Sequence, residues 1–394
     1  MILGLTGLSL IIWLYLTFGH HGFWRRREFL PTSTTSNVES WPSIISLTPA
    51  RNEAELIAKS FSSILEQSYQ GPFESILIDD SSEDDTSAIA KDISKVSSRS
   101  EMVHIIQAEK LPQGWSGKLW ALQSGHDYTD KMKSVPDYYW LSDADISHEP
   151  ETLTRLVQWA QKQDIALVSL MVTLNCKGFW ERLIIPAFIY YFQLLYPFHA
   201  VNNVKRSEAG AAGGCILISR AAVQSIGGFH AIKDKLIDDC SLAQAVKAKG
   251  HKIWLGHGTE SLSLRNSARF SQLCKMVART AFVQLSHSYI WLLLAVLSMF
   301  LIYILPVLSF VYGIAHQQWL LVIIAASTWS LMAYTYWPTI RAYKLKGFET
   351  FLMPFTASLF MGMTLYSSWL HFRGLHAGWH NRSYASTDKH RNVN

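Results

Sequence analysis

The sequence predicts an α/β domain with a mostly parallel sheet, joined to an N-terminal membrane anchor and to C-terminal transmembrane helices. Between residues 41 and 280, short apolar runs alternate with helical patterns, which is typical of a parallel sheet covered by helices on both faces. Only 16% of the residues are charged, against roughly 25% in soluble domains, so part of the chain is expected in a membrane. Four long stretches carry no charge and approach or exceed the roughly 20 residues that cross a bilayer: 2–18, 289–315, 318–340 and 350–370.

The first apolar stretch predicts a transmembrane anchor, residues 1–19, rather than a cleaved signal peptide. No basic residue precedes the stretch, and Arg25–Arg27 follow it, an order that places the following chain in the cytoplasm by the positive-inside rule. We therefore expect an integral protein of the inner or plasma membrane with a cytoplasmic domain at 41–280. Residues 289–372 are the predicted C-terminal transmembrane helices, and residues 373–394 form a basic tail.

Five apolar runs predict the strands of the sheet, and a helical pattern or a loop follows the first four: Ser43–Leu47, Ser75–Ile78, Met102–Ala108, Tyr138–Ser142 and Ile165–Val172. Helices are predicted after Thr48 and from about Asp85, Lys118 and Pro150, because apolar residues recur there at helical spacing. These helices would cover the sheet.

Two apolar segments keep more than one interpretation. Residues 179–199 are rich in aromatics but interrupted by Pro186 and Pro197, which favours an interfacial helix at the membrane surface over a full span. A pair of ordinary buried helices is the alternative. The segment 350–370 contains Pro354, so it either spans the membrane or forms a re-entrant hairpin.

Polar residues follow the predicted strands at their carboxyl ends, where ligands bind in sheets of this kind: Thr48–Glu53, Asp79 and Asp80, then Asp143 and Asp145. If the fourth strand ran on through Asp145, both carboxylates of that pair would lie on one side of it. Neighbouring carboxylates resist ionisation unless a cation lies between them. The alternative is that Asp143 or Asp145 caps the next helix.

The chemistry of carboxylates favours a divalent cation at the Asp143–Asp145 pair. Mg²⁺ and Mn²⁺ prefer oxygen ligands, often one or two carboxylates completed by substrate phosphates, so a nucleotide diphosphate would complete the site. The sequence contains neither a P-loop nor a glycine-rich dinucleotide motif. The phosphates would therefore be held by the metal and by cationic side chains, for which Lys118 and Arg279 are candidates. A second pair, Asp238 and Asp239, begins a predicted helix, where capping and general-base roles are compatible.

Charge and cysteine usage narrow the range of partners. The net charge of +5 comes with basic residues beside the apolar stretches, which indicates an anionic membrane surface rather than nucleic acid. The four cysteines form no CxxC pair and fit reduced thiols in the cytoplasm. A transporter is disfavoured, because the apolar stretches lack the ionisable residues that mark ion pathways.

Several motifs together resemble a known family. The segments "TPARNE", "LIDDSSEDDT", "SDAD" and "IDDCSLAQAVKAKGHKIW" are similar, in order and spacing, to those of family-2 glycosyltransferases of the GT-A fold. The segments "LPQGWSGKLWAL", "GAAGGCILISR" and "KMVARTAFVQL" resemble the membrane-bound, hopene-associated branch, which is akin to ceramide glucosyltransferases. The resemblance covers roughly residues 1–380 and implies a Rossmann-like domain that binds a nucleotide-sugar donor, with UDP as the expected nucleotide.

The resemblance also implies roles for individual residues. Four residues would line the nucleotide base and ribose: Pro49, Arg51, Glu53 and Asp80. Asp143 and Asp145 match the DxD pair, with Asp145 the firmer ligand of Mg²⁺ or Mn²⁺, and Asp239 matches the general base. Arg279 matches the arginine of the QxxRW motif, which helps to hold the diphosphate.

The implied activity is an inverting, metal-dependent transfer of one sugar to a membrane lipid, a hopanoid or another terpenoid or sphingoid-type lipid. The QxxRW match lacks its Gln and Trp, because Met276 and Thr280 stand there. In processive synthases that Trp contacts the growing chain, so its absence argues against the main alternative, a processive polysaccharide synthase. Near the C-terminus, His380 and Asn381 depart from a related "WKGR" segment, and that segment is given no role.

Overall fold

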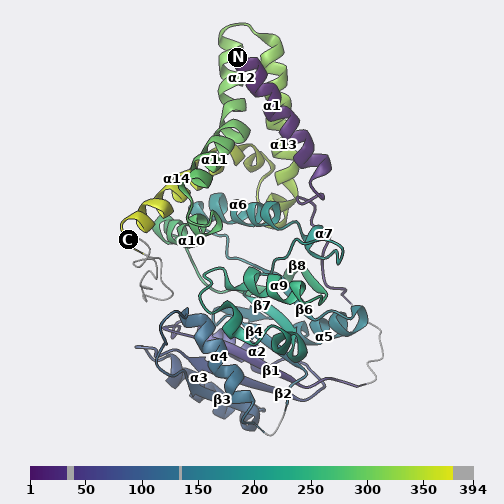
Figure 1. The fold of residues 1–394 in the computed structure, drawn as a ribbon, viewed down its shortest axis with the longest axis vertical. Coiled ribbons are helices and arrows are strands. Elements are labelled where there is room, and N and C mark those ends of the chain that lie inside the picture. The colour runs from purple at the N-terminus through teal and green to yellow at the C-terminus, as the bar shows by residue number, and fades with distance from the viewer. Residues whose placement is uncertain (33–39, 133–134, 376–394) are drawn as a thin grey trace, which may run out of the picture. The chain divides into compact units, whose positions relative to one another are not determined.

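The computed structural model describes residues 1–32, 40–132 and 135–375, so most of the predicted basic tail and the segment with His380 and Asn381 lie outside the described residues. The chain divides into two compact units, and each is described by itself (Figure 1). The sheet unit contains Glu28–Asn175 and Ala200–Asn266. The helical unit contains Met1–Arg27, Cys176–His199 and the described residues 267–375.

The sheet unit is built on an eight-stranded mixed sheet of order β3-β2-β1-β4-β7-β6-β8-β5. The strands are β1 (Ile44–Ala50), β2 (Phe73–Asp79), β3 (Val103–Gln107), β4 (Tyr138–Ser142), β5 (Ile146–His148), β6 (Leu167–Thr173), β7 (Cys215–Ser219) and β8 (Ile253–Ser263). Strands β3, β2, β1 and β4 are parallel, whereas β7 is antiparallel to both β4 and β6. The predicted α/β class is confirmed, and all five predicted strands are present. The sheet is parallel on one side of β7 and mixed on the other.

Helices cover both faces of this sheet (Figure 1). They are α2 (Ile57–Leu65), α3 (Thr86–Val96), α4 (Gly117–Thr129), α5 (Thr152–Gln163), α8 (Arg220–Ser225) and α9 (Asp238–Ala248), with 3₁₀ turns at Ser100–Met102 and Phe229–Ile232. Helices α2 and α5 bury Phe61 and Leu156 in one core with Trp140 of the sheet. On the other face, a Cβ at Gly125 of α4 would lie 3.0 Å from the Ile78 side chain, so α4 packs closely against the strands.

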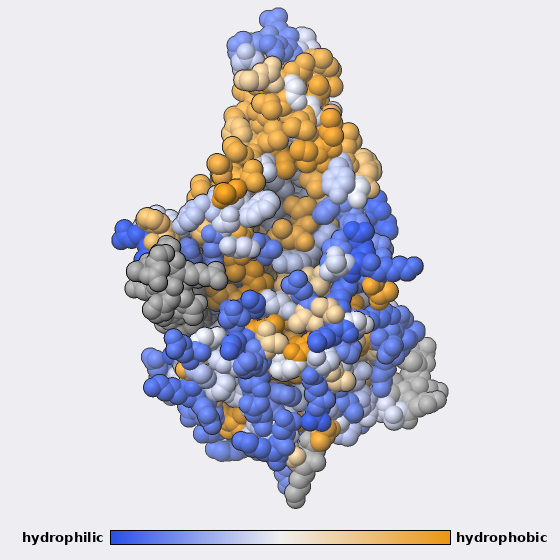
Figure 2. All heavy atoms as spheres, in the orientation of Figure 1, coloured by the Kyte–Doolittle hydropathy of each residue, from blue (hydrophilic) through white to orange (hydrophobic). Residues whose placement is uncertain are grey.

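The helical unit contains the apolar stretches. Its elements are α1 (Ile2–Leu14) with the π-turn Tyr15–Gly19, α6 (Phe179–Leu195), α10 (Phe270–Gln284), α11 (Tyr289–Met299) with the π-turn Phe300–Ile304, α12 (Leu305–Ala315), α13 (Trp319–Ala342) and α14 (Met353–Phe372), which follows the 3₁₀ turn Gly347–Leu352. The short helix α7 (Phe198–Val201) leads from this unit to the sheet unit. Figure 2 shows a hydrophobic surface over α1, α11, α12 and α13.

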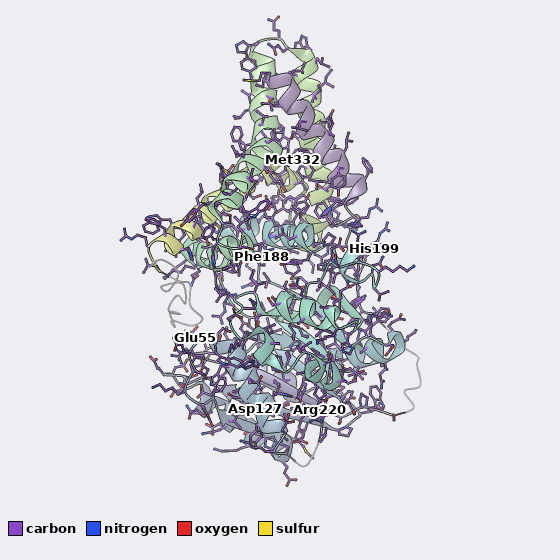
Figure 3. All side chains as sticks on the ribbon, viewed as in Figure 1. Glu55, Asp127, Phe188, His199, Arg220 and Met332 are labelled. Atoms are coloured by element: carbon purple, nitrogen blue, oxygen red, sulfur yellow. The ribbon has the colours of Figure 1, made fainter. Side chains whose placement is uncertain are left out.

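Five helical stretches of the described chain are long and apolar enough to cross a membrane: Ile2–Gly19, Phe179–Val201, Tyr289–Ala315, Trp319–Ala342 and Gly347–Phe372. Residues such as Met332 on α13 pack inside the unit, and Figure 3 labels it together with Phe188 on α6. The remaining side chains of these stretches include many exposed Leu, Ile, Phe and Trp residues, which suits a lipid environment.

The expectation that Pro186 interrupts the segment 179–199 is wrong, because Pro186 lies inside the continuous helix α6, whereas Pro197 does lie beyond its end. For 350–370 the sequence left both a span and a re-entrant hairpin open. Pro354 stands in the first turn of α14, where a missing backbone N–H is tolerated, so Met353–Phe372 is one helix and not a hairpin. The interfacial role of 179–199 stays a prediction.

Candidate active site

The two aspartates of "SDAD" lie in a turn and do not continue the strand. Strand β4 ends at Ser142, and the next strand begins at Ile146. A strand running through Asp145, the condition under which both carboxylates would lie on one side, is therefore not present. Lys118 Nζ lies 2.6 Å from Asp143 Oδ1, whereas Arg265 Nε donates to Asp145 Oδ2 at 2.8 Å. Each carboxylate has its own cationic partner.

Lys118 connects two acidic segments of the sheet unit. It lies in the first turn of α4, whose N-cap Ser116 accepts a hydrogen bond from Leu119 N. Its ammonium is 2.6 Å from Asp143 and 3.4 Å from Asp238. Burial alone would lower the pKa of Lys118, but Asp143 and Asp238 outweigh it and raise that pKa above the ordinary value. Lys118 is therefore a fixed positive charge inside an acidic cluster.

The position of Asp239 is fixed by backbone donors. Its Oδ2 accepts a hydrogen bond from Gly213 N at 2.8 Å, and its Oδ1 accepts one from Cys240 N at 2.7 Å. Burial, and next the charge of Asp238, raise the pKa of Asp239 to about 6, against the opposing effects of Lys118 and the two N–H groups. A carboxylate with a pKa near neutrality is well suited to general-base catalysis.

Gly213 allows these groups to approach one another. A Cβ at this position would lie 3.0 Å from Lys118 Nζ and 3.4 Å from Asp239 Oδ2. An added Cβ would therefore press on the ammonium of Lys118, whereas its distance from Asp239 is an ordinary contact. The close approach of Lys118 to the segment before β7 thus favours glycine at 213.

A cavity opens among these residues. Its polar lining comes from Lys118, Asp143, Gly213, Asp238 and Asp239, and Pro49 and Ser142 border it. The remaining lining is apolar: Leu119, Leu122, Leu141, Ile216, Phe229, Ile232 and Leu242. Pro49, Lys118, Asp143 and Asp239, all predicted as site residues, thus line one cavity although they are far apart in the sequence.

The other predicted donor-binding residues gather at the carboxyl ends of β1 and β2. Arg51 is buried, donates to the backbone oxygen of Ser81 at 2.8 Å and also to that of Asp80, and so ties the loop after β1 to the loop after β2. Glu53 is buried and pairs with Arg265. In the same two loops, Asn52 and Ser81 have φ values of 52° and 56°, a left-handed conformation that is uncommon for residues with a side chain.

His148 supports the acidic turn from behind. Its Nε2 is 2.8 Å from Ser142 Oγ and its Nδ1 is 2.8 Å from Ser261 Oγ, so the imidazole bridges the end of β4 to β8. Burial lowers the pKa of His148 to about 3, so the ring is neutral at physiological pH. A neutral imidazole can donate through one nitrogen and accept through the other, as this bridge requires.

The charge balance of the site fits a divalent cation. Five carboxylates surround two cations: Glu53, Asp143, Asp145, Asp238 and Asp239 around Lys118 and Arg265. Burial, and the charges of Asp145 and Asp238, raise the pKa of Asp143 despite Lys118. Among the described residues, no three Asp, Glu, His or Cys side chains form a complete metal site. Mg²⁺ or Mn²⁺ needs only one or two carboxylates when substrate phosphates supply further ligands, so Asp143 and Asp145 fit that role.

Arg279 belongs to the helical unit. It is exposed on α10, on the same face as Lys275, one helical turn earlier. Its predicted contact with the diphosphate stays a prediction.

Three residues of the site had no predicted role. Arg265 follows β8 in "SLRNS", and a single arginine in a polar segment gives no periodic signal. Gly213 belongs to "GAAGGCILISR". The sequence shows the glycines of this segment but does not show that Lys118 and Asp239 lie against one of them. His148, three residues after Asp145, was indistinguishable from an ordinary strand histidine.

Part of the chain matches a known protein family. Residues 46–227 match the family model described as Glycosyl transferase family 2. Over 167 residues the chain is 31% identical to 4,4'-diaponeurosporenoate glycosyltransferase from Staphylococcus haemolyticus (strain JCSC1435), a match that covers 42% of this chain and 39% of that protein. The chain thus matches about two-fifths of the length of this curated relative.

Among solved structures, a mannosyltransferase from Pyrobaculum calidifontis in complex with GDP-Man and Mn²⁺ superposes with a TM-score of 0.52 at 15% identity, over 93% of this chain and 98% of that chain. At this identity the likeness establishes the fold alone. Residues 46–227 are thus similar to glycosyl transferase family 2, and the sheet unit has a GT-A-like fold.

Proposed function

We propose that this protein is a glycosyltransferase that transfers one sugar from a nucleotide-diphospho-sugar to a membrane lipid with inversion of the anomeric centre. The observation that carries the proposal is the position of Asp239. This carboxylate is held by two backbone N–H groups beside a cavity that Lys118 and Asp143 also line. A base fixed beside a cavity that an acidic metal-binding turn also borders is the arrangement a single displacement needs.

In the proposed mechanism, Asp239 accepts the proton of the acceptor hydroxyl as that oxygen attacks the anomeric carbon. The bond from that carbon to the diphosphate breaks on the opposite side, which inverts the centre. Asp143 and Asp145 would hold Mg²⁺ or Mn²⁺, which neutralises charge that develops on the leaving diphosphate. Arg279 is proposed to assist at the same phosphates.

Pro49, Arg51, Glu53 and Asp80 are proposed to bind the nucleotide, with UDP as the expected nucleoside diphosphate. They lie at the carboxyl ends of β1 and β2, next to the strand that leads into the metal-binding turn. In open α/β sheets, ligands bind at the carboxyl ends of the strands. The position of these residues supports their role.

The acceptor is proposed to be a lipid, a hopanoid or another terpenoid or sphingoid-type lipid, reached from the cytoplasmic side. Five stretches long and apolar enough to span a membrane support a lipid acceptor. The curated relative is named for 4,4'-diaponeurosporenoate, which is a lipid-like acceptor. Arg25–Arg27 after the first stretch support a cytoplasmic sheet unit.

The test is a screen of labelled UDP- and GDP-sugars against membranes that contain the protein, scored for label in extracted lipid. Asp239→Asn membranes serve as the matched control. We expect one donor to label one lipid with a single sugar, and only with the wild type. Label in a ladder of longer products would favour a processive synthase, and equal labelling by the Asp239→Asn control would contradict the proposed mechanism.

A further inference from the structure

Lys118 contacts both parts of the acidic cluster, for which different roles are proposed. On one side it contacts Asp143 at 2.6 Å, in the turn proposed to hold the metal and the diphosphate. On the other side it lies 3.4 Å from Asp238 and close enough to Asp239 to influence its proton affinity. The ammonium of Lys118 therefore lies between the proposed position of the leaving diphosphate and the proposed base.

The geometry of a single displacement identifies what must occupy that interval. The anomeric carbon is bonded to the diphosphate before transfer and to the acceptor oxygen afterwards, so the donor's sugar ring lies between the two. Because the diphosphate belongs at Asp143 and Asp145 and the acceptor hydroxyl at Asp239, the ring must lie beside Lys118. This step depends on the proposed function.

The charge around Lys118 does not favour a phosphate contact. Two carboxylates, Asp143 and Asp238, already offset the positive charge of the ammonium, and the charge of the diphosphate would be balanced by the metal proposed at Asp143 and Asp145. An uncharged hydroxyl needs no free positive charge to bind. An ammonium has three N–H donors, and among the described residues Lys118 has two carboxylate partners.

We propose that Lys118 and Asp238 form the subsite for the donor's sugar, with Lys118 donating a hydrogen bond to a ring hydroxyl and Asp238 accepting one. This assignment replaces the phosphate contact predicted for Lys118 from the sequence. A hydroxyl both donates and accepts, so one hydroxyl, or two neighbouring ones, satisfies the pair. The subsite thus recognises a sugar that carries free ring hydroxyls, independently of the nucleotide.

The experiment compares two ligands on two matched variants. Lys118→Met and Arg265→Met each remove one positive charge from the same acidic cluster. Dissociation constants of UDP, UDP-glucose, GDP and GDP-mannose are measured for the full-length protein in detergent with Mn²⁺. The ratio of the nucleotide-sugar constant to that of its own nucleoside diphosphate isolates the sugar contribution, because the loss of charge affects both ligands.

For Lys118→Met we expect this ratio to rise about 10-fold or more, the effect of losing a hydrogen bond to a charged donor. For Arg265→Met we expect the ratio to stay near that of the wild type, although both constants change. Equal weakening of nucleoside diphosphate and nucleotide sugar in Lys118→Met would return Lys118 to the phosphates and overturn the proposal.

Two further measurements keep the proposal testable if Lys118→Met does not fold. Asp238→Asn retains a helix-start residue and should also raise the ratio. With the wild type, deoxy analogues of the bound nucleotide sugar that lack one ring hydroxyl should bind more weakly at one or two positions; uniform affinity would overturn the subsite. If the wild type binds no nucleotide sugar at all, the proposed function itself fails, which is a distinguishable result.

Discussion

At one end of the candidate site Lys118 contacts Asp143 and Asp238, and at the other Arg265 pairs with Asp145 and Glu53. Both ends place one cation between two carboxylates. The Lys118 side chain is 19% exposed, however, and the Arg265 side chain is 42% exposed. Solvent therefore reaches the guanidinium of Arg265 more than the ammonium of Lys118, although Asp145 and Glu53 are more buried than the two carboxylates beside Lys118.

This difference in exposure indicates different roles for the two ends of the site. The Lys118 end also holds Asp239 through Gly213 N and Cys240 N, so a proton acceptor there stays in place. At the Arg265 end, the proposed Mg²⁺ or Mn²⁺ would replace the guanidinium as the partner of Asp145. Under the proposed function, the Lys118 end positions the reacting groups and the Arg265 end exchanges cations. The predictions below test this contrast.

The largest effect is expected at the exposed end. Asp145→Asn removes the charge proposed to bind the metal, so transfer should be abolished and nucleotide-sugar binding weakened. EDTA should silence the wild type, and Mn²⁺ or Mg²⁺ should restore it, as measured by labelled lipid. Full activity after thorough chelation would rule out a metal at the "SDAD" turn.

Asp239→Asn should lower kcat about 10²- to 10⁴-fold, the usual contribution of a general base, with donor affinity nearly unchanged. Asn is comparable to Asp at helix starts, so α9 should persist. Steady-state kinetics alongside donor titration would separate this result from that of Asp145→Asn. If Asp239→Asn turned over at near the wild-type rate, the base would lie elsewhere, with Asp238 the next candidate.

The pH dependence follows from the raised pKa of Asp239, about 6. The proton acceptor is lost as pH falls through 6, so kcat should rise with pH across that range. Because folding raises the pKa of Asp239, the protonated carboxyl stabilises the folded state at pH values below the pKa of the unfolded chain. This stabilisation is lost as the pH rises through 6. Relative to the wild type, Asp239→Asn should therefore gain up to about 3 kcal/mol between pH 4 and 8. Thermal unfolding of both proteins at the two pH values would reveal it; an unchanged difference would contradict it.

Removal of Lys118 and removal of Arg265 should lower the stability of the sheet unit by different amounts. Lys118→Met should destabilise the sheet unit by about 2–3 kcal/mol, between the values for exposed and for fully buried pairs, whereas Arg265→Met should change stability by about 0–1 kcal/mol. Denaturant unfolding of the three proteins provides the measurement. Equal destabilisation by the two substitutions would erase the contrast between the ends.

The smallest change tests the close approach at the Lys118 end. Gly213→Ala adds one methyl group 3.0 Å from Lys118 Nζ and 3.4 Å from Asp239 Oδ2, so the ammonium must shift by a few tenths of an ångström. We expect a fall in kcat of about 10-fold, because small misplacements of catalytic groups are costly. Gly362→Ala on α14 is the control, since nothing lies within 4 Å of its added Cβ, and it should leave kcat unchanged. A wild-type kcat in Gly213→Ala would show that the added methyl group does not disturb Lys118.

The local pattern of apolar and polar residues predicted much of the secondary structure. Apolar runs bounded by polar loops predicted β1, β2, β3, β4 and β6, because a buried strand needs little more than that run. Long uncharged stretches predicted the apolar helices for the same reason. The polar residues at the ends of β1, β2 and β4 were predicted as a site because parallel strands bring their carboxyl ends to one edge.

Partners that are distant in the sequence were decided only by the tertiary structure. Asp143 pairs with Lys118 and Asp145 with Arg265, 120 residues further on, because the turn after Ser142 directs the two carboxylates to different cations. Alternation along a strand could not predict this, since the strand stops before the first aspartate. Gly213 and Asp239 likewise meet through the antiparallel insertion of β7 beside β4. Residue type and spacing determine which groups can carry chemistry, but charge pairing depends on distances through space, which only the packed fold establishes.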